Sequence, residues 1–271
     1  MSTSEMNHVK PPQTTSNDVK QRQTTVAIIP ARYASTRFPG KPLADLGGKP
    51  MIQRTWERVQ QASTIDRVLI ATDDERIATA ARAFGAEVAL TRADHVSGTD
   101  RIAEVVRSAQ LQLRATVVVN VQGDEPFIRP EQIDAVVRPI LEGQATIATL
   151  CRRIDDADAL FDPNVVKLTR DMAGNALYFS RHPIPFLRDV PPAEWLAKNT
   201  HFQHLGLYAF RTDVLLELTE LPPAPLEALE ALEQLRWLSA GHRIACVETP
   251  HATIGIDTPE DLARWRAHFA E

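Results

Sequence analysis

The sequence predicts an α/β fold, with a Rossmann-like, mostly parallel sheet flanked by helices and a smaller antiparallel subregion. In the first half of the chain, short apolar runs alternate with helix-period segments, which is the rhythm of βαβ units. The runs VAIIP, RVLIAT and TVVVNV are apolar over most of their length, as expected of parallel strands that helices cover on both faces. After Cys151 the rhythm changes to short strands joined by a turn, which predicts the antiparallel subregion.

The elements follow in order from Thr24. Strands are expected at 25–29, 67–71, 86–90 and 116–121, and helices at about 50–62, 74–84, 99–110 and 130–141. A hairpin at 165–169 and 176–179, a strand at 204–210, a helix at about 224–240, a strand at 243–248 and a helix from Pro259 come next. In the helix at 224–240, helical spacing predicts one buried leucine face, formed by Leu226, Leu229, Leu232 and Leu235.

The chain is expected to comprise four parts. Residues 1–23 hold almost no large apolar side chains, which predicts a disordered tail. The folded part divides into an α/β domain at 24–150, the antiparallel subregion at 151–215 and a return to the α/β domain at 216–271. With 44% hydrophobic residues among 271, the chain can bury one large core or two closely joined cores.

Composition excludes several classes of partner. The net charge of -5 is mixed along the sequence, so no broad basic face argues for nucleic acid and no basic amphipathic helix argues for a membrane surface. No apolar stretch approaches the roughly 20 residues of a membrane span. Cys151 and Cys246 lie in strand-like runs without metal-type spacing, which predicts buried thiols and a reducing compartment, with the cytoplasm as the default.

A cationic loop directly follows the first strand. Residues 30–41, PARYASTRFPGK, supply charge from Arg32, Arg37 and Lys41 and hydroxyl donors such as Ser35. Loops at the carboxyl ends of parallel strands are where ligands bind, and this set of donors suits a polyphosphate. The loop lacks both the Walker A spacing and the GxGxxG pattern. A solvated basic loop is the alternative.

Two aspartates are candidates for a magnesium site. Asp124 follows the strand at 116–121, and Asp257 precedes the last helix. Carboxylates at the strand ends of a sheet that also carries a cationic loop could hold Mg²⁺ against bound phosphates. The alternatives are structural, since Asp124 could cap a turn and Asp257 or Thr258 could cap the helix that begins at Pro259.

Seven blocks in order carry a resemblance to a known family: PARYASTRFPGKPL, TRADHVSGTDR, NVQGDEP, ALYFSR, HLGLY, PLEALEALEQLR and GIDTPEDL. Between about residues 25 and 268 the chain resembles the 3-deoxy-manno-octulosonate cytidylyltransferases, which make CMP-Kdo for bacterial lipopolysaccharide. The resemblance implies a homodimeric, magnesium-dependent nucleotidyltransferase in which the anomeric hydroxyl of Kdo attacks the α-phosphate of CTP and pyrophosphate leaves. It makes 24–150 the nucleotide-binding domain, 151–215 the sugar-binding and dimerisation subregion, and 216–271 the part with the second metal-binding aspartate.

The resemblance also implies roles for single residues. Arg32, Ser35, Arg37 and Lys41 would grip the triphosphate, and Lys41 and Arg37 would act in catalysis together with the metal ligands Asp124 and Asp257. Arg92, Ser97 and Gln122 would contact the base and ribose, although Ser97 suits a plain helix N-cap equally well. For Kdo, the resemblance implies contacts from Arg181, His204, Tyr208, Glu233 and Gln234, whereas Glu227 and Glu230 are expected on a solvated helix face.

Three other functions compete with this one. A CMP-sialic acid synthetase runs the same chemistry on another keto sugar acid, but its phosphate loop is richer in glycine than this one. A sugar-1-phosphate nucleotidylyltransferase has a phosphate as acceptor and should carry further cations in place of the hairpin block. A non-catalytic nucleotide-binding protein on the same fold would bind CTP without turning it over.

Overall fold

The computed structural model describes residues 23–34, 38–108 and 114–266, and in these ranges nine strands form one sheet. Nearly all of the expected tail, Ser35 and Arg37 lie outside them. The strands are β1 Thr25–Ala31, β2 Arg67–Thr72, β3 Glu87–Leu90, β4 Val117–Asn120, β5 Ile147–Arg153, β6 Lys167–Arg170, β7 Ala176–Ser180, β8 Phe202–Arg211 and β9 Ala245–Glu248.

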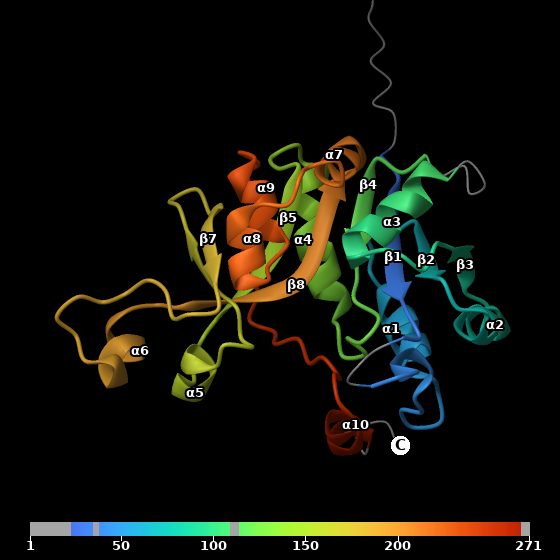
Figure 1. Ribbon diagram of the computed structural model, residues 1–271, viewed down its shortest axis with the longest axis horizontal. Coiled ribbons are helices and arrows are strands. Elements are labelled where there is room, and N and C mark those ends of the chain that lie inside the picture. The colour runs from blue at the N-terminus through green and yellow to red at the C-terminus, as the bar shows by residue number, and fades with distance from the viewer. Residues whose placement is uncertain (1–22, 35–37, 109–113, 267–271) are drawn as a thin grey trace, which may run out of the picture.

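Helices pack on both faces of this sheet (Figure 1). They are α1 Met51–Val59, α2 Glu75–Ala83, α3 Gly98–Arg107, α4 Pro130–Leu141, α5 Ala157–Phe161, α6 Trp195–Lys198, α7 Thr212–Leu218, α8 Pro225–Glu230, α9 Gln234–Ser239 and α10 Pro259–Arg266. The 3₁₀ helices η1 and η3 span Lys41–Leu43 and Pro192–Glu194. None of the helices in the described part of the chain is both long enough and apolar enough to cross a membrane.

The strand order is β3-β2-β1-β4-β8-β5-β9. Strands β1 to β4 run parallel, β8 runs antiparallel to both β4 and β5, and β9 runs parallel to β5. The β6–β7 hairpin attaches to β8, which makes the antiparallel part an extension of the main sheet. The expected α/β fold with a mostly parallel sheet and an antiparallel subregion is confirmed.

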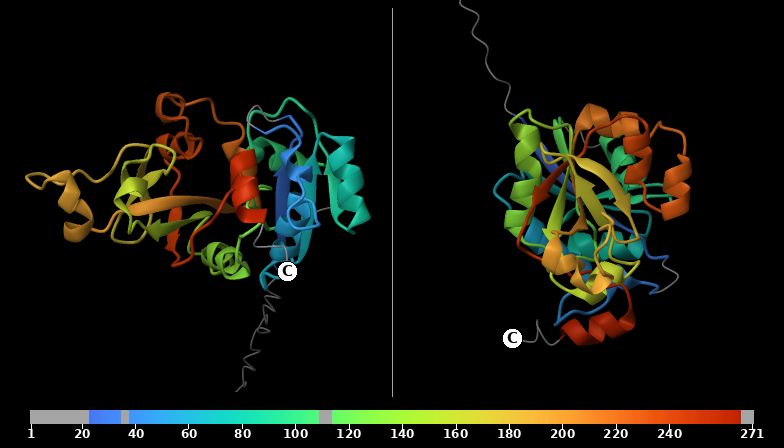
Figure 2. Two further views of the ribbon diagram at one scale, coloured as in Figure 1. Left: turned by 90° about the horizontal axis from the view of Figure 1, so that it is seen from below. Right: turned by 90° about the vertical axis from the view of Figure 1, so that its left-hand side faces the viewer.

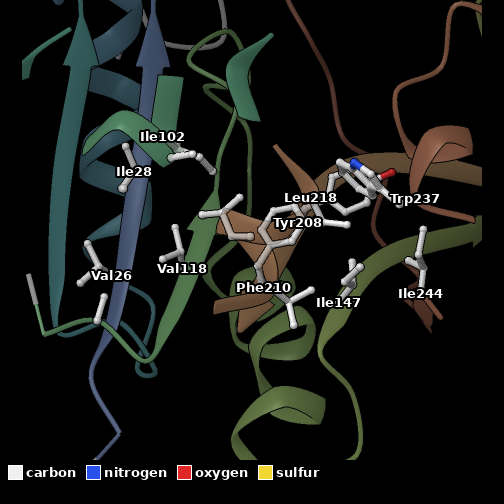
Figure 3. Packing of buried hydrophobic residues seen from close by; sticks show 14 of the residues in the cluster. Val26, Ile28, Ile102, Val118, Ile147, Tyr208, Phe210, Leu218, Trp237 and Ile244 are labelled. Carbon is white, nitrogen blue, oxygen red and sulfur yellow. The ribbon is translucent and has the colours of Figure 1, made fainter. Parts of the chain in front are cut away.

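The core has two layers because successive strand residues face opposite sides of the sheet. On β1, Val26 and Ile28 belong to the layer under α3, α7 and α9, while Ala27 and Ile29 belong to the layer under α1, α2 and α4. Figure 3 shows the first layer, which continues from β1 across β4 and β8 to Trp237 on α9. The thiols of Cys151 and Cys246 are free and buried, as expected.

Two connections extend away from the main sheet, one between β5 and β6 that carries α5 and one between β7 and β8 that carries α6 (Figures 1 and 2). Together they form a small core around Ile154, Leu160 and Trp195. The β6–β7 hairpin and the residues that follow β7 carry exposed large apolar side chains at Met172, Leu177 and Phe186.

The prediction of a single helix at 224–240 is wrong, because this range holds two short helices, α8 and α9. The chain leaves α8 at Ala231, which has a left-handed φ of 50°, and starts again as α9. Leu232 and Leu235 are buried as expected, but Leu226 and Leu229 on α8 are 41% and 81% exposed. A long-range contact accounts for the break, because the Arg181 guanidinium donates to the carbonyls of Glu230 and Ala231 at the end of α8.

Candidate active site

A cleft of about 330 Å³ opens at the carboxyl ends of β1 and β4. The strand order reverses between these two strands, since β2 and β3 lie to one side of β1 and β4 lies to the other. Such a switch point is where open α/β sheets bind ligands. The lining residues come from the end of β1 and the loop after it, from the start of α3 and the segment before it, from the loop after β4 and from the segment before α10: Pro30, Ala31, Arg32, Lys41, Pro42, His95, Val96, Ser97, Gly98, Arg101, Gln122, Gly123, Asp124 and Asp257.

The cationic loop is anchored at both ends of its described part. Gly40 donates its N–H to the carbonyl of Tyr33 (2.9 Å) and has a φ of 73°, which favours glycine. A Cβ at this position would also lie 3.0 Å from the Tyr33 ring. The guanidinium of Arg76 on α2 lies 3.3 Å from the centroid of the same ring. These contacts deliver Lys41 to the cleft at the start of η1.

Lys41 lies between the two candidate metal ligands. Its Nζ donates to Asp124 Oδ2 at 2.5 Å and to Asp257 Oδ1 at 3.1 Å. The lysine side chain is 14% exposed, and the two aspartate side chains are 31% and 46% exposed. The structure therefore brings together three of the four residues expected to act in catalysis, across 83 and 216 positions of sequence.

Backbone pairing and a small core place Asp257 beside Asp124. Ile256 donates its N–H to the Asp124 carbonyl (3.0 Å), and its side chain is fully buried with Leu46 and Met51. Thr258, rather than Asp257, caps α10, since its hydroxyl accepts from the N–H of Asp261 at 3.2 Å. The carboxylate of Asp257 therefore lies at the cleft, where it contacts Lys41, and is not the cap of α10.

The QGDEP turn is held by close packing. A Cβ at Gly123 would lie 3.0 Å from the Pro30 carbonyl oxygen on β1 and 3.1 Å from Ile52 Cδ1 on α1, so the loop after β4 can approach these two elements closely only with glycine there. The next acid, Glu125, is buried, and its Oε2 has no hydrogen-bond partner among the described residues. Burial, then the charges of Asp124 and Asp257, raise the pKa of Glu125 to about 8. The sequence analysis did not single out this residue.

The other end of the cleft is formed by the start of α3. Ser97 lines the cleft and is also the N-cap of α3, where it forms a capping box with Asp100, so both sequence-based interpretations fit its position. Gln122 lines the cleft and donates to Asn120 Oδ1 at 3.4 Å. Arg92 does not line it, because its side chain is 69% exposed and pairs with Asp94 at 3.3 Å.

Two further residues at this end were missed by the sequence analysis. The Arg101 guanidinium lines the cleft although its side chain is only 5% exposed, and it is held by the Asp73 carboxylate (3.0 Å) and the Thr91 hydroxyl (2.5 Å). His95 also lines the cleft and contacts the Glu104 carboxylate through Nε2. Both residues lie in the TRADHVSGTDR block, which was the available signal.

The residues expected to bind the sugar do not line the cleft. His204 is hydrogen-bonded to the Thr149 hydroxyl (3.0 Å), and burial lowers its pKa to about 3, so the imidazole is neutral. Tyr208 pairs with Asn120 of β4 and is 7% exposed. The rings of His204 and Tyr208 lie 5.4 Å apart, as the shared strand face predicts. Arg181 donates to backbone carbonyls, including those of Pro163 and Glu230.

Glu233 joins the sugar-side residues to the cleft. Its carboxylate accepts hydrogen bonds from the hydroxyls of Ser97 (2.9 Å) and Thr99 (2.7 Å). Burial raises the pKa of Glu233, and these two hydrogen bonds oppose the shift. Gln234 is 5% exposed, and its Nε2 has no hydrogen-bond partner among the described residues.

The expectation that Glu227 and Glu230 form a solvated face is wrong. Glu227 accepts from the Arg236 guanidinium at 2.5 and 2.8 Å and so holds α9 against α8. Glu230 accepts from the Ser180 hydroxyl (2.7 Å) and the Arg181 N–H (2.9 Å). Both carboxylates are used in tertiary contacts that helical spacing does not reveal.

The acidic pair fits a divalent cation that a nucleotide brings with it. The described residues contain no group of three or more His, Cys, Asp or Glu side chains that could hold a metal ion. Mg²⁺, however, is usually bound by one or two carboxylates together with phosphate oxygens and waters. Asp124 and Asp257 already converge on one positive charge, the Lys41 ammonium, which marks the position that a cation between them would share.

The fold and the cleft define a nucleotide-binding α/β protein with charged loops at the switch point of its sheet. Within this class the chain belongs to the cytidylyltransferase family, whose model matches residues 26–244.

The similar proteins described here carry names for the same enzyme activity. A 3-deoxy-manno-octulosonate cytidylyltransferase of Syntrophotalea carbinolica is 53% identical, over 90% of this chain and 97% of the relative. One from Solibacter usitatus is 51% identical, over 88% of this chain and 92% of the relative. A structure of CMP:2-keto-3-deoxy-manno-octonic acid synthetase complexed with CTP superposes with a TM-score of 0.84 and 43% identity, covering 92% of this chain and 99% of that one.

Proposed function

We propose that this chain is a 3-deoxy-manno-octulosonate cytidylyltransferase, which activates Kdo with CTP to give CMP-Kdo and pyrophosphate for lipopolysaccharide biosynthesis. The observation that carries the proposal is the convergence of Lys41, Asp124 and Asp257 in the switch-point cleft. The relatives at about 50% identity, whose matches cover 88% and 90% of this chain, support the choice of Kdo as acceptor.

The charges in the cleft indicate how CTP would lie. Arg32 and Lys41 line one end, where Ser35 and Arg37 complete the cationic loop in sequence. Near the other end, the carboxylates of Asp100 and Glu233 do not line the cleft but interact with the first turn of α3, and their charge would disfavour phosphate there. The triphosphate therefore belongs at the Lys41 end, and the cytosine and ribose belong beside Ser97, Gln122 and Arg101, with Arg92 reaching in from the surface.

Asp124 and Asp257 would hold Mg²⁺ together with phosphate oxygens of CTP. When bound, the ion would neutralise phosphate charge and lower the pKa of the attacking hydroxyl. Lys41 would give up at least part of its contact with the two aspartates and donate to the phosphates instead. Its ammonium would then stabilise the charge that develops on the leaving pyrophosphate.

The transfer itself needs no covalent intermediate with the protein. The anomeric oxygen of Kdo forms a bond to the α-phosphorus, the bond from that phosphorus to the β-phosphate oxygen breaks, and the hydroxyl proton is released. The chain contributes mainly position and charge. Arg181 would meet the sugar carboxylate, while the neutral His204 and Tyr208, Glu233 and Gln234 would meet hydroxyl groups. Because Arg181, His204 and Glu233 have partners within the protein, sugar binding at these residues requires that they exchange partners.

The homodimer and the cytoplasmic location belong to the same proposal. The β6–β7 hairpin and α8 expose Met172, Leu177 and Leu229, which are 105%, 61% and 81% exposed, and a second copy would cover them. Free, buried cysteines suit a reducing compartment. Light scattering of wild type and Leu177→Asp would test the dimer, which should become a monomer only in the variant.

Mass spectrometry of the products is the direct test of the reaction. The protein is incubated with CTP and Mg²⁺, and with either Kdo or sialic acid. We expect CMP-Kdo and pyrophosphate in the first mixture and unchanged CTP in the second. Activation of sialic acid but not of Kdo would assign the chain to the other keto sugar acid. Binding of CTP without any product would identify a non-catalytic nucleotide-binding protein.

A further inference from the structure

Glu233 connects two parts of the molecule that are remote in sequence. It lies between α8 and α9, and its two carboxylate oxygens accept from Ser97 Oγ at 2.9 Å and Thr99 Oγ1 at 2.7 Å, 136 and 134 positions away. Each oxygen has its own hydroxyl donor, so the carboxylate fixes both residues at once. This bridge holds the first turn of α3 against α9.

The bridged segment forms one wall of the nucleotide cleft. Ser97 and Gly98 line the cleft, and a Cβ on Gly98 would lie 3.3 Å from Pro30 Cγ, so the segment is packed closely against the carboxyl end of β1. Thr99 is 3% exposed and does not line the cleft. Its hydroxyl can therefore influence a bound nucleotide only through the position of its neighbours.

The orientation of Ser97 depends on the same bridge. Its hydroxyl accepts from the N–H of Asp100 at 3.1 Å as the cap of α3 and also donates to Glu233. Asp100 Oδ2 lies 3.0 Å from the same hydroxyl and is a competing acceptor. Without Glu233, the hydroxyl proton would turn to Asp100, and the α9 side of the bridge would be lost.

We propose that Glu233, acting through Ser97 and Thr99, is a positioning residue for the nucleotide site and sets the affinity for CTP before any sugar is bound. This rests on the proposed function, since it takes CTP as the ligand of the cleft. It adds a role for Glu233 on the nucleotide side to the contact expected with the sugar. The bridge also links the sugar-side residues on α9 to the nucleotide wall through two hydrogen bonds.

The test measures the Kd of CTP with Mg²⁺ by titration calorimetry on the full chain, without sugar. Thr99→Val removes the hydroxyl and keeps the branched shape, whereas Thr99→Ser keeps the hydroxyl. We expect Thr99→Val and Glu233→Gln each to raise the Kd about tenfold, which is about 1.4 kcal/mol. Thr99→Ser should stay within about twofold of wild type, because the donor to Glu233 remains. Thr99→Ala replaces Thr99→Val if the buried valine prevents folding.

A control variant and a double variant distinguish loss of the Glu233 bridge to α3 from a general weakening of the packing around α8 and α9. Glu230→Gln, at the end of α8, removes a carboxylate that contacts Ser180 and Arg181 but not α3, so the CTP Kd should stay within twofold. The double variant Thr99→Val with Glu233→Gln should have a CTP Kd within about twofold of the higher Kd of the two single variants. The effects should not add, because both substitutions disrupt the same bridge.

Different results of these titrations would contradict either the role of Glu233 or the proposed function. Wild-type affinity in both Thr99→Val and Glu233→Gln, with normal CTP binding by wild type, would overturn the inference and leave the proposed function standing. An equal loss in Glu230→Gln, or a loss in Thr99→Ser as large as in Thr99→Val, would also overturn it, because general loosening would then be the cause. Failure of wild type to bind CTP would instead contradict the proposed function itself.

Discussion

The nucleotide-side and sugar-side residues are held in different ways. Lys41, Asp124 and Asp257 lie on loops and short turns, are partly exposed and carry formal charges that meet in the cleft. Tyr208 and His204 lie within strand β8, where Tyr208 is buried in the core and His204 is partly buried and hydrogen-bonded to Thr149. We expect substitutions in the first group to lower activity with little effect on the free energy of unfolding. The second group contributes to the core, so a change there should alter folding as well as binding.

The largest effect is expected from removing one charge at the nucleotide side. Asp124→Asn and Asp257→Asn should each lower kcat/KM by about 10³-fold, or about 4 kcal/mol of transition-state stabilisation. Thermal unfolding should change little, because both side chains are partly exposed. Steady-state kinetics with CTP, Kdo and Mg²⁺ would measure this. Activity within tenfold of wild type in both variants would break the comparison.

A buried ring on the sugar side should show the opposite balance. The ring of Tyr208 packs on Trp237 and Phe210 at centroid distances of 5.1 and 5.7 Å. Tyr208→Ala should therefore lower the free energy of unfolding by about 3 kcal/mol, as large-to-small core changes do. Tyr208→Phe is the matched control and should keep stability within about 1 kcal/mol. Denaturant unfolding that shows no loss in Tyr208→Ala would mean that the ring is not part of the core.

The imidazole of His204, which is partly buried, should make stability depend on pH. Burial lowers its pKa from 6.5 to about 3, so below pH 6.5 the unfolded chain takes up a proton that the folded chain does not. Stability from this residue is intact above pH 6.5 and is lost as the pH falls toward 3, by about 2 kcal/mol between pH 7 and pH 5.

His204→Phe tests this dependence and keeps the ring contacts with Phe179 and Tyr208. Chemical unfolding of both proteins at pH 7 and pH 5 gives the comparison. The loss of stability between these two pH values should be about 2 kcal/mol smaller in the variant than in wild type. If wild type and the variant lose the same amount of stability, folding does not lower the pKa of His204, and the imidazole is protonated in the folded chain at pH 5.

The smallest effect is expected at Arg92, which lies at the edge of the nucleotide side. Its side chain is 69% exposed and pairs with an exposed aspartate. Arg92→Ala should change the free energy of unfolding by less than about 0.5 kcal/mol and raise the KM for CTP only about threefold. A hundredfold rise in KM would show that this arginine closes over the nucleotide as a main contact.

Much of the fold could be predicted because its signals are local. The continuously apolar runs predicted the parallel strands. Helix α4 begins and ends at the residues that its apolar pattern predicted. The break at Ala231 could not be predicted, since four leucines at helical spacing suit one helix. Arg181 and the Glu227–Arg236 pair, which decide the break, act across the tertiary structure.

The candidate site was predictable to a similar degree. Strand ends and the family blocks pointed to Lys41, Asp124 and Asp257, and the fold brings them together. Glu125 and Arg101 were missed because their significance lies in burial, which a charged residue in a loop or an amphipathic helix does not reveal in sequence. The Glu233 bridge was missed because it joins two segments more than a hundred residues apart.

The most direct test is a crystal structure with CTP and Mn²⁺, which substitutes for Mg²⁺ and can be located by its anomalous signal. We expect one Mn²⁺ bound by carboxylate oxygens of both Asp124 and Asp257 and by a phosphate oxygen of CTP, with Lys41 Nζ moved onto the phosphates. A metal ion bound by the phosphates alone, with both aspartates still paired to Lys41, would contradict the account.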